Sequence, residues 1–542
     1  MKRSIIILSG LTILLGGLLA GCGQQKQTAQ KQKITLMQTT ELTSLDSTNQ
    51  ATLPEFNTLT NTTEGLYRLN KNDQPIPAMA TKIVKPTANG TQYLFKIRRN
   101  AKWSNGDPVT ASDFEYAWKR AMNPANNPVY TYIFSGIKNA DAINAGKKSY
   151  QTLGIKALNK RTLQITLDHP MPYFNKLVTV PVFLPQNESF VKQVGVKKYG
   201  SSAKTTVSNG AFKVSHWNGT NDSYRLVRNN YYWDKKTIHL KQINYLTVKD
   251  SNTAHNLFAS NKLDDATITG VTAKELQNNA DLKHVAKAWT YYLQVNQKNG
   301  APLANQKLRQ AISLVIDRKT LTKNVLADGS QPATSFVSPG TATDPTTGKD
   351  FSRETSTTLG TNTKKAKQLW QAGLAESNQS NQTVQLSIIG DDQDVTKNVS
   401  QYLQQQIEQK LPNVKVSIKN VPDEALHSLK ADNKFALSQW YWLADFSDPI
   451  NYLGVLATNN SLNSGHYSDT QFDQLMDKAN SAAANNQQVY WQTLRQAEAR
   501  IQQTSAIIPL YYVRESHLVN PKLHGVLYHQ AGEHDYTRAY LK

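Results

Sequence analysis

The stretch VQLSIIGDDQDVTKNVSQYLQQQIEQKLPNVKVSI, residues 384–418, predicts a strand, a helix and a second strand in succession. Val384–Ile389 is short and mostly apolar, as in a buried strand, and residues 414–418 alternate between apolar and polar. Between them, Val395–Lys410 carries apolar side chains at a helical spacing. A helix of this length can cross over a sheet, so the two strands are expected to be parallel neighbours in an α/β fold.

The same mixture of strands and helices is predicted elsewhere in the chain. Residues 93–97 and 163–167 alternate between apolar and polar side chains, which indicates half-buried strands. A helix is predicted after Thr110 or Ser112, either of which can be its N-cap, with Phe114, Ala117, Trp118 and Ala121 on one face. Ile507–Val513 predicts another buried strand near the C-terminus. A chain of 542 residues is too long for one core, so several lobes are expected.

The net charge of +21 limits the classes of partner. Lysine and arginine are scattered along the chain, and no dense basic run is interleaved with aromatic residues, which argues against nucleic acid binding. A basic protein of this kind suits the anionic polymers of a cell envelope.

The only cysteine, Cys22, follows an N-terminal region that resembles a lipoprotein signal. Lys2 and Arg3 precede an apolar stretch that is short for a membrane span, and Leu-Ala-Gly-Cys ends it. The resemblance implies that residues 1–21 are a signal peptide, that Cys22 carries lipid and that residues 22–33 are a flexible tether. An ordinary secretory cleavage site with an unmodified cysteine is the alternative.

Motifs of enzymes are missing from the sequence. It contains no G-x-S-x-G and no H-E-x-x-H, and Ala145–Ser149 (AGKKS) lacks the first glycine of a phosphate-binding loop. His524, His529 and His534 recur every five residues, which places them on neither one helix face nor one strand face. We therefore expect no catalytic residues, no metal site and no cofactor.

A second unusual stretch, SQWYWLADFSDPINYLG at residues 438–454, surrounds one acid, Asp445, with aromatic residues. A carboxylate in apolar surroundings needs a group that stabilises its charge. Residue chemistry alone favours an internal salt bridge or a helix cap for Asp445. Asp448, which precedes Pro449, is expected to form a turn or cap. Trp440 and Trp442 share a strand face; Trp440 is expected in the core.

Six stretches in a fixed order carry a resemblance to a known family. They are TEGLYRLN (63–70), WSNGDPVTASDFEYAWKRAMNP (103–124), IKNADAINAGKK (137–148), LGIKALNKRTLQITLDHPMPYF (153–174), VSNGAFKVSHW (207–217) and NNYYWD (229–234). Together they closely resemble the OppA-like oligopeptide-binding proteins of bacterial ABC importers. The resemblance covers nearly all of the chain after the tether.

The resemblance implies a two-lobed α/β fold of the periplasmic-binding-protein type, with an extra subdomain, that closes like a flytrap over its ligand. By position, lobe I would comprise residues 34–64, 187–290 and 513–542, the extra subdomain residues 65–186, and lobe II residues 291–512. The peptide would lie extended between the lobes and pair with strand edges, so that backbone bonds serve many sequences.

The resemblance also implies a role for Asp445. The family has an aspartate after a Trp-x-Ala element that binds the α-ammonium group of the peptide, and here this is Trp442-Leu443-Ala444-Asp445. The positive partner of Asp445 would then be the ligand. Trp442 would line the cleft, and Tyr441 and Leu443 would offer backbone groups.

Further ligand contacts implied by the family are Tyr132, Tyr511 (with Tyr512 as an alternative) and the segment from Ala51 to Leu53, which would pair with the peptide main chain. The chain departs from the family in two places. VPDEALHSLKADNKF (residues 421–435) has no tryptophan, and Gln439 replaces an arginine. The cation that receives the peptide carboxylate is therefore not identified.

The resulting prediction is a monomeric receptor, lipid-anchored to the outer face of the cytoplasmic membrane of a Gram-positive bacterium. It would bind oligopeptides and deliver them to the permease and ATPase complex of an ABC importer. The alternatives are a binding protein for a signalling peptide or another solute, and a basic surface adhesin. An adhesive role should survive loss of Asp445 and weaken with salt.

Overall fold

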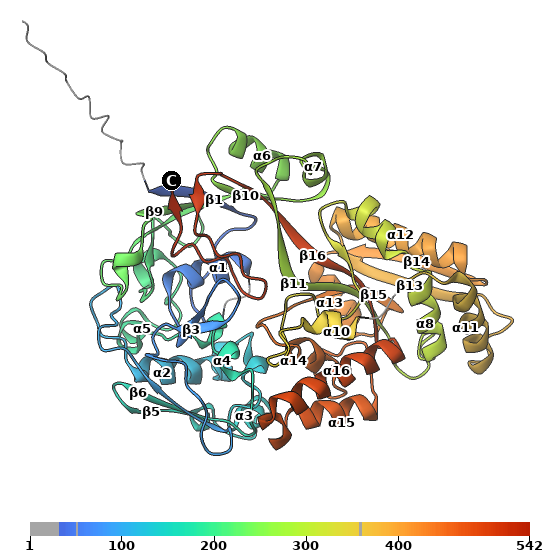
Figure 1. Ribbon diagram of the computed structural model, residues 1–542, viewed down its shortest axis with the longest axis horizontal. Helices are drawn as coiled ribbons and strands as arrows, with labels where there is room; N and C mark the ends of the chain where they lie inside the picture. The colour runs from blue at the N-terminus through green and yellow to red at the C-terminus, as the bar shows by residue number, and fades with distance from the viewer. Residues whose placement is uncertain (1–31, 50–51, 357–359) are drawn as a thin grey trace, which may run out of the picture. The chain divides into compact units, whose positions relative to one another are not determined.

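Two long strands, β11 (Leu282–Val295) and β16 (Ile507–Val519), pair antiparallel through the middle of the largest sheet. The computed structural model describes residues 32–49, 52–356 and 360–542, and Gln32–Lys542 forms one unit. In Figure 1, β16 runs from the elements around β1 to the elements around β13. The two strands therefore connect two groups of elements, as expected of a two-lobed protein.

The sheet contains eleven strands within the described residues, in the order β14-β13-β15-β11-β16-β10-β1-β9-β8-β7, with β12 beside β16. The N-terminal half of β16 pairs with the C-terminal half of β11, whereas its C-terminal end also pairs with β10. The other strands are β1 (Lys33–Gln38), β7 (Phe212–Ser215), β8 (Ser223–Arg228), β9 (Gln242–Thr247), β10 (Asp265–Ile268), β12 (Gln331–Pro332), β13 (Val384–Asp391), β14 (Val414–Val421) and β15 (Leu437–Leu443).

The predicted βαβ unit is confirmed. β13 and β14 pair in parallel along their whole length, from Val384 opposite Val414 to Asp391 opposite Val421. The helix between them, α12 (Asp394–Lys410), buries the predicted apolar stripe, because a crossover helix must cover one face of the sheet. Helices α8 (Gln306–Val315) and α11 (Thr363–Glu376) lie in the same group, at the right of Figure 1.

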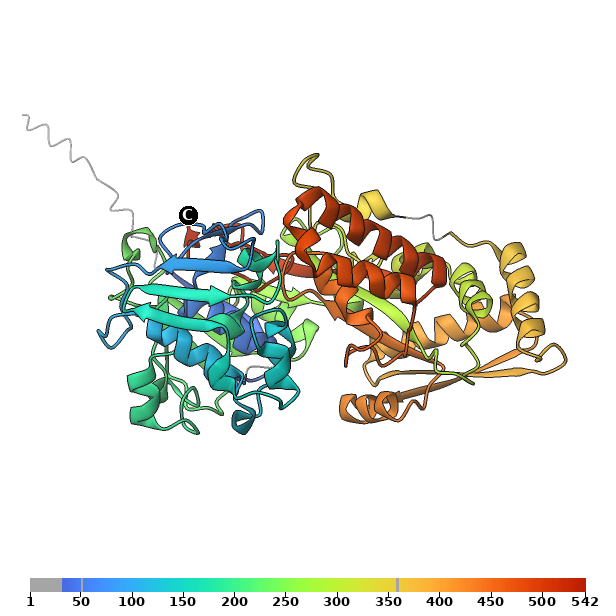
Figure 2. The same ribbon diagram turned by 90° about the horizontal axis from the view of Figure 1, so that it is seen from below.

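The strands predicted around residues 93–97 and 163–167 are also confirmed. A three-stranded sheet of β4 (Gln92–Lys96), β6 (Thr162–Thr166) and β5 (Ile155–Asn159) lies beside α2 (Ala111–Ala121), as Figure 2 shows. Thr110 is the N-cap of α2, in a capping box with Asp113. Of the two caps predicted, Thr110 is therefore the one used.

Strand β16 extends beyond its predicted end at Val513 to Val519. Residues 514–517 (RESH) are polar, so the apolar pattern that predicted the strand stops at Val513. These residues stay in the sheet because strands lie on both sides of them, with β10 opposite Ser516–Val519 and β11 opposite Arg514–Leu518.

None of the helices in the described ranges combines the length and the hydropathy needed to span a membrane.

A buried ion pair joins the segment after β1 to helix α2. Nη1 and Nη2 of Arg120 donate to the two carboxylate oxygens of Asp46 at 2.6 Å, and Nη1 also donates to Thr48 at 2.8 Å. Asp46 is 4% exposed and Arg120 is 6% exposed, so the pair is removed from water. Breaking a pair of this kind leaves a buried charge without its partner.

Arg120→Met is therefore expected to lower the free energy of unfolding by about 3–5 kcal/mol. The exposed pair of Lys192 and Glu188 provides the control, since Lys192→Met should have little effect on stability. Urea denaturation followed by circular dichroism measures both. Equal losses in the two variants would contradict the assignment of Arg120 as a structural contact.

Candidate functional site

A cavity of about 580 Å³ lies between elements from distant parts of the chain. Its walls come from α1 (Leu53–Thr62), the short helix at Thr131–Phe134, strands β11 and β15, and α13 (Asp423–Ala431). The volume suits a small ligand such as a short peptide. The lining includes a group of aromatic residues: Phe56, Tyr130, Tyr132, Trp289, Tyr292, Trp440, Tyr441 and Trp442.

Strand β15 presents an unpaired edge to this cavity. On one side it pairs with β11 along its whole length, from Leu437 to Leu443. On the other side, its pairing with β13 ends at Ser438. In the described part of the chain no other strand continues along Gln439–Leu443. The backbone donors and acceptors on this edge can therefore pair with an extended ligand.

Asp445 follows β15 and its carboxylate meets only neutral partners. The Tyr132 hydroxyl donates to both carboxylate oxygens, at 3.2 Å each, and Asn451 Nδ2 donates to Oδ2 at 3.0 Å. Asn451 Oδ1 in turn accepts from the Asp445 backbone N–H at 2.9 Å and from Trp442 Nε1 at 3.0 Å. Among residues 32–49, 52–356 and 360–542, Asp445 forms no ion pair. The internal salt bridge considered from the sequence is absent from this range.

The environment disfavours the ionised form of Asp445. Burial raises the pKa of its carboxyl to about 6, against the lowering effect of the hydrogen bonds from Asn451 and Tyr132. The side chain still keeps part of its surface in contact with the cavity. A second acid in the lining, Glu533, has its pKa raised by burial to about 7. A bound cation would stabilise these carboxylates in their ionised form.

Six of the eight ligand residues expected from the sequence line this cavity: Leu53, Tyr132, Tyr441, Trp442, Leu443 and Asp445. Tyr441 is 40% exposed and Leu53 is 42% exposed. Leu53 is the first residue of α1, which corrects the expectation that an extended edge runs through it; a proline follows it, and Thr52 caps the helix. Ala51 and Cys22 lie outside the described residues.

Tyr511, another of the expected ligand residues, does not line this cavity. Tyr511 is 4% exposed, and its ring stacks on Tyr291 with centroids 4.8 Å apart. Tyr512 is also buried, and its hydroxyl contacts Ser335 at 2.8 Å. Tyr511 lies on β16, and its role in ligand binding remains a prediction.

Trp440 was expected in the core, but it lines the cavity and is only partly buried. It shares the strand face of Trp442, and β13 leaves β15 just before it, so no strand covers it. Asp448 forms a turn, one of the two roles expected of it, whereas the N-cap of the helix that follows is Pro449. Its carboxylate accepts from the N–H of Ile450, the first residue of α14 (Ile450–Leu453), and from the Tyr490 hydroxyl at 2.8 Å.

Several residues of the site were not predicted from the sequence: Trp289, Lys430 and Glu533, which line the cavity, and Asn451, which donates to Asp445. Asn451 lies inside the aromatic stretch, so its proximity to Asp445 was open to prediction. Lys430 belongs to a polar run that is typical of an exposed helix, and Glu533 lies in a loop near the C-terminus. Only the tertiary fold brings these two side chains to the cavity.

Two other features of the structure could hold a ligand: a cluster of possible metal ligands and a groove beside α2. Glu515, His517 and His534 bring possible metal ligands within 4.8 Å of one another, but His517 donates to Asp265 at 2.8 Å. Burial lowers the pKa of His517, yet the charge of Asp265 outweighs it and raises the value to about 10. A protonated His517 forms ion pairs with Asp265 and Glu515 and has no lone pair for a metal.

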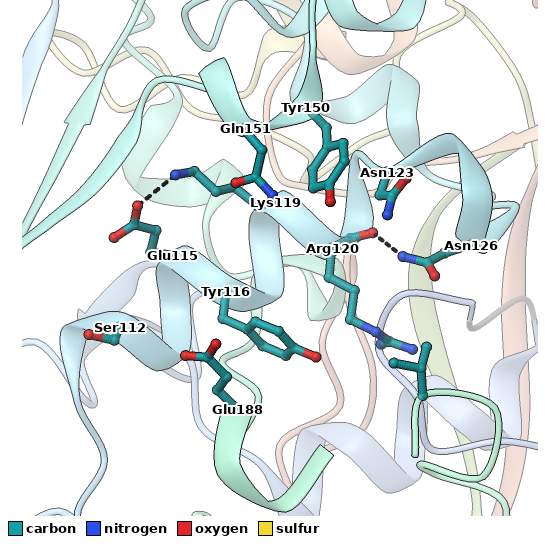
Figure 3. Close-up of a pocket in the computed structure, with 11 residues that line it drawn as sticks. Ser112, Glu115, Tyr116, Lys119, Arg120, Asn123, Asn126, Tyr150, Gln151 and Glu188 are labelled. Carbon is teal, nitrogen blue, oxygen red and sulfur yellow. Dashed lines mark hydrogen bonds and ion pairs between the residues drawn. The ribbon is translucent and has the colours of Figure 1, made fainter. Parts of the chain in front are cut away.

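Figure 3 shows a second groove of about 500 Å³, formed by α2 and its neighbours. Lys119 contacts Glu115, and the guanidinium group of Arg120 belongs to the ion pair with Asp46. Charged groups in this groove thus already have partners within the protein. The cavity at Asp445 is the stronger candidate, because its acid lacks one.

Comparison with known proteins agrees with this architecture. Residues 74–464 match the family model "Bacterial extracellular solute-binding proteins, family 5 Middle". The chain belongs to this family. It is 34% identical to the dipeptide-binding protein DppE of Bacillus subtilis over 474 residues, covering 88% of this chain and 85% of the relative.

Two solved structures of family members are similar over nearly the whole chain. Listeria monocytogenes OppA bound to peptide is 34% identical with a TM-score of 0.79, covering 95% of this chain and all of the other. The pheromone receptor PrgZ, a structure described for its mode of peptide binding, is 33% identical with a TM-score of 0.81, covering 94% and 100%. The family 5 solute-binding fold is therefore the fold of this chain.

Asp445→Asn is expected to change how the stability of the ligand-free protein depends on pH. The raised pKa means that the native state favours the neutral carboxyl, so this contribution is complete below about pH 4 and is lost as the pH rises through about 6. Asparagine does not titrate and avoids the loss. The stability of the variant relative to wild type should therefore rise by about 1–3 kcal/mol between pH 4 and 8.

Thermal unfolding of protein refolded without ligand, at several pH values, measures this difference. Asp392→Asn, at an exposed position, is the control and should show no such trend. A pH-independent difference between Asp445→Asn and wild type would show that burial does not shift this carboxyl.

Proposed function

We propose that this protein is an extracellular receptor that binds oligopeptides in the Asp445 cavity and delivers them to an ABC importer. The observation that carries the proposal is a carboxylate with no cation among the described residues, placed at the end of an unpaired strand edge. An α-ammonium group supplies the missing positive charge. The backbone that follows it can pair with β15.

Binding through the strand edge explains how one site accepts many sequences. Backbone N–H and C=O groups are the same in every peptide, so Tyr441 and Leu443 need no particular side chain. The remaining volume is lined by aromatic rings and can hold water between ligand and protein. The similar Listeria monocytogenes OppA is bound to peptide, and the Bacillus subtilis relative is named a dipeptide-binding protein, which supports this ligand class.

Ligand binding would close the two groups of elements on each other. The strands that join them, β11 and β16, shift register between Ala286 and Thr290, and such irregularities bend strands. The expected lobe boundaries at residues 290 and 513 fall near the middle of these strands. A receptor of this kind presents its closed form to the permease and ATPase, acts as a monomer and has no catalytic role.

A signalling peptide is the second candidate ligand, because the similar structure of PrgZ is that of a pheromone receptor. It would use the same ammonium contact at Asp445. An adhesive protein would not, so adhesion through the basic surface predicts no effect of Asp445 on binding and a strong effect of salt.

The test is calorimetric titration of protein that has been denatured and refolded to remove bound ligand. Free di- to decapeptides should bind wild type, whereas N-acetylated forms of the same peptides should bind at least about 30-fold more weakly. Asp445→Asn should show a similar loss with free peptides, since truncating one partner of a buried charge pair is costly.

Two controls accompany this titration. Asp392→Asn should bind as wild type, and Trp440→Phe should lose far less affinity than Asp445→Asn. Equal affinity for acetylated and free peptides would contradict the ammonium contact, and no heat with any peptide would contradict the receptor function.

The lipid anchor is a separate part of the proposal, and it rests on the sequence around Cys22. A lipidated cysteine would hold the protein at the outer face of the cytoplasmic membrane through the tether before β1. Cys22→Ser should release the protein into the medium or the soluble fraction. Cell fractionation followed by immunoblotting measures this, and a Cys22→Ser protein that stays with the membrane would contradict the anchor.

A further inference from the structure

One end of the large sheet has an outward face that carries basic side chains. Alternate residues of β7, β8, β9 and β1, such as Val214, Leu226 and Ile34, are buried in the core, so the residues between them point outward. The strand registers align these outward residues in two rows across the four strands. The two rows, which we term the β7–β1 face, are Lys213, Val227, Gln242 and Lys33, and Ser215, Arg225, Asn244 and Thr35.

The three cations of this face have no counter-charge in the described part of the chain. Lys33, Lys213 and Arg225 are exposed, and the side chain of none of them forms a hydrogen bond or an ion pair there. Lys213 and Lys33 stand at opposite ends of one row, three strand spacings or about 14 Å apart. Arg225 lies in the next row, so the three charges share one small area.

Acids close to this face do not neutralise it. Asp264 accepts hydrogen bonds from the Thr35 N–H at 2.8 Å and from Asn520 at 2.7 Å, so its carboxylate is engaged within the sheet. Asp222 precedes β8 and lies beyond the row of Arg225. Because the face is the surface of a sheet, an extended anionic surface can meet all three cations at once.

The face lies next to the point where the folded unit begins. Lys33 is the first residue of β1, and Cys22 precedes Gln32 by ten residue steps. A chain of this length spans at most about 36 Å even when it is fully extended. A lipid on Cys22, as proposed above, would therefore keep the β7–β1 face within this distance of the membrane.

We propose that the β7–β1 face lies on the anionic headgroups of the membrane to which the protein is anchored. The inference rests on the proposed lipid anchor, and it adds a second contact that orients the protein. Basic side chains reinforce a lipid anchor, because each one close to an anionic surface is attracted to it. The attraction is electrostatic, since the two rows carry no large exposed apolar side chain that could enter the lipid.

This orientation leaves the ligand cavity accessible. In the sheet, β11, β16 and β10 stand between β15 and β1, which separates the two strands by about 19 Å. Figure 1 shows β9 and β1 in the group of elements opposite to the group that contains β13. A membrane on the β7–β1 face thus does not cover the open edge of β15.

Co-sedimentation with lipid vesicles tests the proposal. Protein that begins at Gly23 carries no lipid and contains the whole compact unit Gln32–Lys542. It should bind vesicles of equimolar phosphatidylglycerol and phosphatidylcholine but not vesicles of phosphatidylcholine alone, and high salt should release it. The triple variant Lys33→Gln/Lys213→Gln/Arg225→Gln should bind the anionic vesicles about a hundredfold more weakly, at about fivefold for each basic residue removed.

A matched control removes the same charge from another element. Lys364, Lys365 and Lys367 are exposed on α11, in the group of elements around β13. The triple variant Lys364→Gln/Lys365→Gln/Lys367→Gln should bind the anionic vesicles as wild type does. Circular dichroism of both triple variants checks that they fold, and this check does not depend on the receptor function.

Failure of wild type to bind the anionic vesicles, or equal losses in the two triple variants, would overturn the proposal. Binding to soluble polyglycerol phosphate without binding to vesicles would assign the face to an anionic wall polymer and would overturn it as well. Because the vesicle assay uses protein without lipid, the anchor itself is judged separately, by the fractionation of Cys22→Ser.

Discussion

The antiparallel pairing of β11 with β16 is the contact on which the fold and the cavity both depend. These strands hold two groups of elements in one sheet, and β15 joins the sheet on the other side of β11. Because β13 leaves β15 after Ser438, the central strand of the binding region keeps an open edge. A sheet that paired every strand fully would have no place for an extended ligand.

The titratable side chains of the cavity are its second feature, beside the open edge of β15. The cavity contains a buried acid at the end of β15 and a buried lysine over Trp440, and neither forms an ion pair within the described residues. Each group is costly to bury alone. In the proposed function, the ammonium group of a peptide would offset the cost of burying Asp445.

Much of this fold could be predicted from the sequence because its patterns are local. The alternation at residues 384–389 and 414–418 and the stripe on α12 predicted a parallel pair with a crossover helix, which is present. The end of β16 was predicted too early, because its polar residues 514–517 stay in the sheet through pairing rather than through an apolar pattern.

The site was only partly predictable. Asp445 could be singled out from the sequence because a lone acid among aromatic residues is chemically unusual. The role proposed for it, binding an ammonium group, rests on the family resemblance. Trp440 was placed in the core because composition does not show where β13 leaves β15. Lys430 gave no signal, since a lysine in a polar helix is ordinarily solvated, and only the packing of α13 against Trp440 buries it.

The most direct test is a crystal structure of the refolded protein with tetraalanine. The account predicts the peptide nitrogen terminus within about 3 Å of the Asp445 carboxylate and the peptide backbone paired with the open edge of β15. A peptide whose ammonium group lies elsewhere, or an Asp445 that pairs with a lysine or arginine of the protein in the bound state, would contradict it.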